Sequence, residues 1–315
     1  MKLAKLVSKF IDFKRSLGMR YETSGFILRS FCRRMGNIDV KEVQPCQVQA
    51  FLTGQGAPTL TWIRKFSTLR RFYDYAIPRG YAAHSPLPTV MKPKSPKRFE
   101  AYIYSTEELR RLLAATARLK TPTCPHRGEV FRMLLLLLYG TGLRRGEAVS
   151  LTMADVNLHD SLLTIRESKF FKSRLVPIGP RLTMELAAYI HRRKRWPFPQ
   201  GPDAALLVSN AGAPLHPRLA VLYFDKLRDW AGIHRDDGAS YQPRLHDLRH
   251  TFAVHRLVHW YRQGADVQRL LPSLSTYLGH RQLSDTQHYL KLTPELLHEA
   301  SKRFEAYAFG EVAHV

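Results

Sequence analysis

Six residues in the last two-thirds of the chain could together hold a phosphate group and attack it. Attack on a phosphodiester builds negative charge on the oxygens around phosphorus, so a site without a metal needs fixed cations aimed at those oxygens. Arginine suits this role because its planar guanidinium stays charged and can bind two oxygens at once. A tyrosine hydroxyl can then serve as the nucleophile. The six residues are Arg144, Lys169, His246, Arg249, His280 and Tyr289.

The two arginines stand in local sequences that favour phosphate binding. Arg144 follows Gly142 in the string TGLRRGE, and a glycine break before a helix would let the backbone approach phosphate. His246 and Arg249 lie three residues apart in LHDLRH, so on a helix they share one face and could meet one phosphate. His250 beside them fits a structural role. Taken singly, these residues are explained better by ordinary surface polarity in a basic protein.

The two remaining signals, His280 and Tyr289, are weak when taken alone. His280 closes the string LGH at the end of an apolar stretch, where a histidine is more often a core residue or a helix cap. A single tyrosine usually belongs to a core or an interface. The joint pattern changes this interpretation, because Tyr289 follows LGH by nine residues, downstream of both arginine strings.

With this order and spacing, the chain resembles the tyrosine recombinases of the phage-integrase family. The resemblance covers roughly residues 5–305 and is specific in the second half, whereas the first half agrees only in helical pattern and basic charge. It implies that Arg144 and Arg249 bind the scissile phosphate. It also implies that His246 and His280 hydrogen-bond the phosphate and handle protons. Tyr289 would attack, giving a 3′-phosphotyrosine and a free 5′-hydroxyl without metal, ATP or any other cofactor.

The resemblance further implies a proton donor for the leaving 5′-oxygen, which in this family is a lysine in a β-hairpin. Lys169 fits best and Lys172 is the alternative, although two phenylalanines stand here where small residues are usual. Glu147 matches a family acid that braces the site, and a structural salt bridge explains it equally well. The phenol has an ordinary pKa near 10, so attack also needs a base, for which His246 is the candidate.

Composition points to a polyanionic partner. The 315 residues include 49 Lys and Arg against 26 Asp and Glu, giving a net charge of +23 and a pI near 10.2. This balance favours nucleic acid. A basic protein of the membrane surface would instead show a segregated amphipathic helix or a polybasic tail. The apolar run at residues 133–139 is too short to span a bilayer, so no membrane partner is expected.

Cysteine usage and the first residues predict a cytoplasmic protein that acts on the nucleoid. The three cysteines are odd in number and widely spaced, which favours neither a metal site nor a disulfide framework. The N-terminus lacks the pattern of a signal peptide.

Two domains are expected, divided by a basic, proline-containing linker at residues 91–100 that includes Lys92 and Lys94. Residues 1–95 read as a helical, basic domain, and the family resemblance implies that it is a SAM-like core-binding domain that contacts DNA. Within it, a helix over residues 59–77 carries cations on its polar side, where they could contact phosphate or form a solvated face. These cations are Arg64, Lys65, Arg70 and Arg71.

Residues 100–315 read as the catalytic domain. Ser105 and Glu108 form the pattern of a helix capping box, and residues 162–166 and 174–178 are strand-like. The predicted fold is therefore mainly α with a small antiparallel sheet, in two domains that form a clamp around DNA. Residues 293–308 read as an amphipathic helix, which could pack on its own chain or, as the family resemblance implies, dock on a neighbouring protomer.

The leading hypothesis is a site-specific recombinase of a mobile element that integrates or excises DNA. Its expected partners are double-stranded DNA and further copies of itself, as a tetramer in the synaptic complex and a monomer when free; partner recombinases and accessory DNA-bending proteins are compatible with it. The alternatives are a type IB topoisomerase-like enzyme and a DNA-binding protein without catalysis. A metal-dependent nuclease is disfavoured because no carboxylate cluster with metal-ligand spacing is seen in the sequence.

Overall fold

The computed structural model describes residues 1–54, 60–89, 101–166, 173–239, 241–291, 298–299 and 301–302. The chain divides into two compact units, Met1–Phe99 and Glu100–Val315. Each unit has its own hydrophobic core. None of the helices in the described ranges is both long and apolar enough to cross a membrane.

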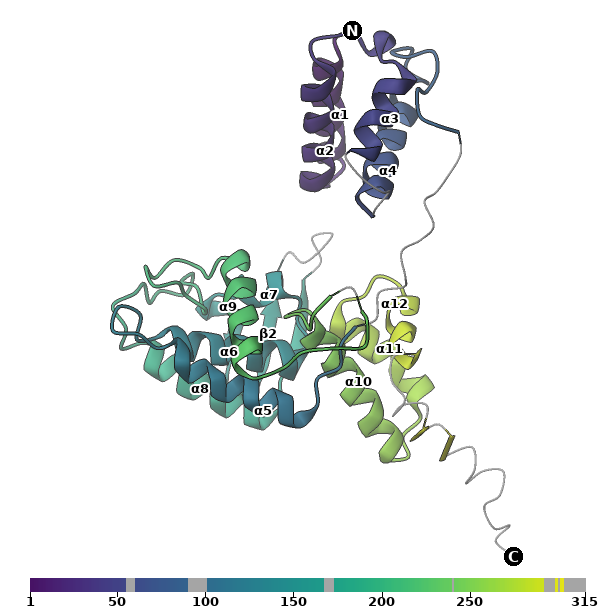
Figure 1. Cartoon of the computed structure of the whole chain (residues 1–315). Helices are drawn as coiled ribbons and strands as arrows, with labels where there is room; N and C mark the ends of the chain where they lie inside the picture. The colour runs from purple at the N-terminus through teal and green to yellow at the C-terminus, as the bar shows by residue number, and fades with distance from the viewer. Residues whose placement is uncertain are drawn as a thin grey trace, which may run out of the picture. The chain divides into compact units, whose positions relative to one another are not determined.

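The first unit consists of helices (Figure 1). Its core contains many aromatic side chains. Phe10 is fully buried, and its ring lies 5.7 Å from that of Phe72 and 5.0 Å from that of Tyr75. The helix expected over residues 59–77 is confirmed as α4. The elements are α1 (Leu3–Ser16), α2 (Glu22–Met35), η1 (Val40–Glu42), α3 (Pro45–Thr53) and α4 (Leu60–Ala76).

The second unit is also mainly helical, with one small sheet (Figure 1). Three strands form an antiparallel sheet in the order β1-β2-β3, and Ile165 pairs with Arg174 across β2 and β3. The strands are β1 (Val156–Asn157), β2 (Leu162–Ile165) and β3 (Arg174–Pro177). The predicted fold class, mainly α with a small antiparallel sheet, is confirmed. The two predicted strands are each one residue shorter than expected, and β1 was not expected from the sequence.

Helix α6 is largely buried in the second unit, where it packs against η2, α7, α8 and α10. The capping box at Ser105 is confirmed: its hydroxyl accepts from the Glu108 backbone N–H, and the Glu108 carboxylate accepts from the Ser105 N–H. The helices are α5 (Thr106–Ala115), α6 (Arg127–Thr141), α7 (Arg145–Val149), α8 (Pro180–Arg193), α9 (Pro217–Trp230), α10 (Asp247–Arg262), α11 (Val267–Leu278) and α12 (Leu283–Gln287). Short 3-10 segments are η2 (Thr116–Leu119), η3 (Met153–Asp155) and η4 (His288–Lys291).

The end of α6 is fixed by a glycine that allows close packing. Gly142 adopts a left-handed conformation with φ of +62°, and its N–H donates to the Leu138 carbonyl. A Cβ at this position would lie 2.5 Å from Phe252 Cδ1 on α10 and 2.7 Å from Leu278 Cδ2 on α11. The missing side chain therefore lets α10 and α11 close on the end of α6.

Substitution Gly142→Ala should lower the free energy of unfolding by about 2–5 kcal/mol, because it adds left-handed strain and overpacks the core. Gly146→Ala is the matched control. A Cβ at Gly146 meets nothing within 4 Å, and alanine favours its helix α7, so this variant should be at least as stable as the wild type. Denaturant unfolding measures both, and equal stability of the two variants would contradict this account of the helix junction.

Candidate active site

Arg144 immediately precedes α7, three residues after the end of α6. It is the N-cap residue of α7, and its backbone N–H donates to Glu147 Oε2 at 3.0 Å. Its guanidinium donates to Glu147 Oε1 at 2.8 Å and to the Gly279 carbonyl at 2.7 Å. The side chain keeps 29% of its surface exposed. Arg144 is thus oriented from two sides while part of its guanidinium can still be reached.

Arg249 lies in the first turn of α10 and is almost completely buried, with 3% of its surface exposed. Its guanidinium donates to the Gly142 carbonyl at 2.7 Å and to the Leu278 carbonyl at 2.8 Å. Burial lowers the pKa of Arg249 to about 10, so the group stays charged at neutral pH. The carbonyls that hold both arginines stand at the C-terminal ends of α6 and α11, where the helix dipole favours cations.

Arg144, Arg249 and the backbone carbonyls that accept their hydrogen bonds form a cluster that we call the arginine cage. Tyr289 lies inside it. The tyrosine belongs to η4 and is 3% exposed, and Arg249 is the cation that acts most strongly on its hydroxyl. Burial raises the pKa of Tyr289, although the charges of Arg249 and Arg144 act in the opposite direction. The hydroxyl is therefore protonated at neutral pH and must lose its proton when it attacks.

Two histidine rings pack on Tyr289. The ring of His280 stacks on it at 5.8 Å with an interplanar angle of 27°, and the ring of His250 meets it at 5.5 Å. His280 follows Gly279, the left-handed C-cap of α11, and its Nδ1 pairs with the Thr286 hydroxyl at 2.6 Å. These contacts fix the imidazole of His280 against the ring of the tyrosine.

The histidines around the cage are neutral at pH 7. Burial, followed by the charges of Arg249 and Arg144, lowers the pKa of His280 to about 3. Burial and nearby cations lower the pKa of His250 to about 4. His246, the N-cap residue of α10, packs its ring on His250 at 5.2 Å. Desolvation of its ring by the surrounding protein, followed by the neighbouring His250 and Arg249, lowers the pKa of His246, although the residue as a whole is exposed. Neutral imidazoles of this kind can accept a proton.

The structure thus brings five sequence-predicted residues into one cluster: Arg144, Glu147, Arg249, His280 and Tyr289. His246 joins them through His250. Lys169 and Lys172 lie outside the described residues, as do Lys92, Lys94 and most of the helix expected at residues 293–308.

Two further residues contact this cluster although no motif in the sequence predicts them: Thr286 pairs with His280, and Arg174 donates to Glu147. The sequence predicts only that Arg174 begins a strand.

The cations expected on α4 divide into two groups. Lys65 donates to the Phe51 carbonyl at 2.7 Å, and its ammonium lies 4.6 Å from the centre of the Phe51 ring. It is therefore engaged within the first unit. Arg64, Arg70 and Arg71 are exposed and remain candidates for phosphate contact.

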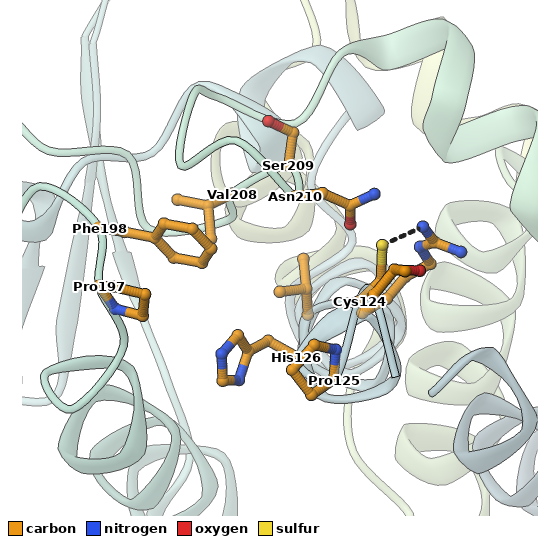
Figure 2. A pocket seen from close by; sticks show the side chains of 11 residues that line it. Cys124, Pro125, His126, Pro197, Phe198, Val208, Ser209 and Asn210 are labelled. Carbon is orange, nitrogen blue, oxygen red and sulfur yellow. Dashed lines mark hydrogen bonds between the residues drawn. The ribbon is translucent and has the colours of Figure 1, made fainter. Parts of the chain in front are cut away.

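A hollow of about 200 Å³ lies at the other end of α6 (Figure 2). Phe198, Pro197 and His126 line one side, and Cys124 accepts a hydrogen bond from Arg127 on another. The 15 residues of α6 correspond to a length of about 22 Å. This hollow is therefore remote from the arginine cage.

Comparison with known proteins places the chain in a family. The model of the phage integrase family matches residues 104–295. A Sinorhizobium fredii protein named as an integrase/recombinase, y4rE, is 36% identical over 307 residues, covering 96% of this chain and 95% of the relative. The tyrosine recombinase XerC of Oceanobacillus iheyensis is 30% identical over 289 residues, covering 90% and 88%.

Solved structures agree in fold. The integrase of transposon Tn1549 in complex with a circular intermediate DNA has a TM-score of 0.68 at 16% identity, covering 96% of this chain and 99% of that chain. A lambda integrase tetramer bound to a Holliday junction has a TM-score of 0.65 at 17% identity, covering 92% and 77%. The chain therefore belongs to the phage integrase family. It is a tyrosine recombinase, an enzyme that breaks and rejoins DNA; the topoisomerase-like and non-catalytic alternatives are not favoured.

The neutral histidines make stability fall on acidification. His250 and His280 have pKa values of about 4 and 3 in the folded protein, below the ordinary value of 6.5. Between pH 6.5 and these lower pKa values, the unfolded chain binds more protons than the folded protein. The free energy of unfolding should therefore decrease as the pH falls below 6.5. Each histidine contributes a slope of at most about 1.4 kcal/mol per pH unit. Denaturant unfolding across this range measures the slope.

Substitution His250→Asn should make that slope shallower, whatever it does to stability at pH 7. His159→Asn is the control, because the His159 side chain is 95% exposed and its loss should leave the slope unchanged. A wild-type slope in His250→Asn would show that this histidine is not held neutral by the fold.

Proposed function

We propose that this recombinase cleaves and rejoins DNA at specific sites with Tyr289 as its nucleophile. The observation that carries the proposal is the position of Tyr289: its ring is buried, stacks on His280 and lies where the charges of Arg249 and Arg144 act on its hydroxyl. Arginine offers five N–H donors in a fixed fork. The two arginines of the cage therefore offer more N–H donors than the backbone carbonyls use, and the others can bind a phosphate.

In the proposed cleavage step one bond to phosphorus forms, another breaks, and two protons are transferred. The scissile phosphate binds to Arg144 and Arg249, which stabilise the charge that develops on its non-bridging oxygens. The Tyr289 oxygen forms a bond to phosphorus, and its proton passes to His246 as the base. The bond from phosphorus to the 5′-oxygen breaks, and that oxygen takes a proton from Lys169. His280 hydrogen-bonds the phosphate.

Rejoining is the reverse reaction with a 5′-hydroxyl from a second DNA strand. The phosphotyrosine linkage keeps the energy of the broken phosphodiester bond, so ligation needs neither ATP nor a metal. Exchange between two DNA sites follows when the incoming hydroxyl comes from the partner site. Integration and excision of DNA are the outcomes of this exchange.

We further propose that residues 1–95 bind the DNA core site and that residues 100–315 carry the chemistry, together enclosing the duplex as a clamp. The first 97 residues contain 18 Lys and Arg against 5 Asp and Glu, which suits contact with the phosphate backbone. Arg64, Arg70 and Arg71 on α4 are the described candidates. Such binding should weaken steeply with salt, because each phosphate contact releases counterions.

The active assembly is proposed to be a tetramer on two DNA sites. The lambda integrase related in fold has been solved as a tetramer on a Holliday junction, and closed assemblies of identical chains are the common form of such oligomers. Accessory DNA-bending proteins or a partner recombinase belong to the same proposal. The integrase of a transposon among the fold relatives agrees with an origin in a mobile element.

Covalent trapping tests the nucleophile. A binding site is first selected from random duplexes, then built into a nicked substrate that loses the 5′-hydroxyl fragment after cleavage. Wild-type protein in EDTA should form a DNA adduct that survives SDS, and Tyr289→Phe should form none because it lacks the attacking oxygen. Tyr241→Phe, which changes an exposed tyrosine, should match the wild type. An adduct of equal yield in Tyr289→Phe would overturn the assignment.

A further inference from the structure

Arg174 is a charged residue of the site to which the proposed reaction gives no role. It begins β3, and its side chain is 13% exposed. Its guanidinium donates to both oxygens of Glu147, at 3.1 Å to Oε1 and 2.8 Å to Oε2, and its Nε donates to the Tyr277 carbonyl at 3.0 Å. A bidentate pair of this kind is strong and holds its geometry. Arg174 therefore joins the strand to α7 and to the last turn of α11.

The same guanidinium fills the space beside Gly279. A Cβ at Gly279 would lie 2.8 Å from Arg174 Nη1 and 2.9 Å from its Cζ. Gly279 has a φ of +67° and precedes His280, and its carbonyl accepts from Arg144. Arg174 thus supports the turn that positions one imidazole and one carbonyl of the cage.

Glu147 forms ion pairs with both Arg144 and Arg174. Its carboxylate accepts hydrogen bonds from Arg174 and from both the backbone and the side chain of Arg144, and only 7% of it is exposed. Burial alone would raise the pKa of Glu147, but the hydrogen bonds from Arg174 and Arg144 lower it to about 2. The carboxylate is therefore ionised. With both arginines the trio carries a net charge of +1, and without Arg174 it would carry none.

We propose that Arg174 is a positioning residue for strand cleavage: as the second counter-ion of Glu147, it leaves the charge of Arg144 available to the scissile phosphate. Without Arg174, the buried Glu147 would have Arg144 as its main counter-ion. The carboxylate would then neutralise the charge of Arg144, which would bind the scissile phosphate less strongly. This inference rests on the proposed function, since it assumes that Arg144 binds that phosphate. It adds a requirement for a third arginine, which acts through Glu147 and Arg144.

The test compares cleavage rates and DNA affinities of five variants on the nicked substrate. Arg174→Gln should slow adduct formation about 10–100-fold, the usual cost of removing a group that orients a catalytic one, with DNA affinity little changed. Arg174→Lys keeps the charge without the fork and should lie between Arg174→Gln and the wild type. The double variant Arg174→Gln/Glu147→Gln restores the net charge of +1 and should be faster than Arg174→Gln alone.

Arg166→Gln is the matched control. Arg166 follows β2, pairs with Asp155 and is 63% exposed, so its loss should leave the cleavage rate unchanged. Thermal unfolding of every variant separates loss of fold from loss of rate. If Arg174→Gln does not fold, the double variant is compared with Glu147→Gln alone. Because Arg174 acts through the charge of Glu147, its loss in that background should leave the cleavage rate nearly unchanged, and a further loss of about 10-fold or more would contradict the inference.

The outcomes separate this inference from the proposed function. If the wild type forms no adduct on its selected site, the proposed function fails before any variant is compared. If the wild type forms the adduct and Arg174→Gln matches it, the inference is wrong while the proposed function stands. If the double variant is as slow as Arg174→Gln, the charge of Glu147 is not what Arg174 balances, and the inference is also wrong.

Discussion

The site depends on the burial of arginine charge. A charge taken out of water costs several kcal/mol unless it is paired and hydrogen-bonded. Arg249 is almost fully buried, and its guanidinium is held by two backbone carbonyls. Carbonyls carry only partial negative charge, so these hydrogen bonds orient the guanidinium without cancelling its charge. The fold thus maintains a positive charge at one place in its interior. A phosphate group bound there would supply the counter-charge that the carbonyls do not.

Four helix ends meet at that place, and this arrangement explains much of the second unit. Helices α6 and α11 end there at left-handed glycines, Gly142 and Gly279, and supply the carbonyls. Helices α7 and α10 begin there and supply the arginines. Because Gly142 leaves no room for a Cβ, the closeness of these ends is part of the site's construction.

Much of the fold could be predicted from local pattern, because a helix is recorded in the sequence by its apolar spacing and caps. The Ser105 capping box and α4 are examples. Strand β1 has only two residues and leaves no such record. Members of the site were recognised from the joint order of short strings. Arg174 and Thr286 were not, because their roles arise from contacts with Glu147 and His280 that exist only in the folded chain. The role of Lys169 stays a prediction.

Mapping the attached nucleotide tests the central claim most directly. The adduct would be digested with trypsin and nuclease, and the modified peptide would be sequenced by mass spectrometry. Residues 282–291 form one tryptic peptide in which Tyr289 is the single tyrosine. The account predicts a nucleotide joined through its 3′-phosphate to Tyr289. A nucleotide on another tyrosine, or on Ser284 or Thr286 of the same peptide, would contradict it.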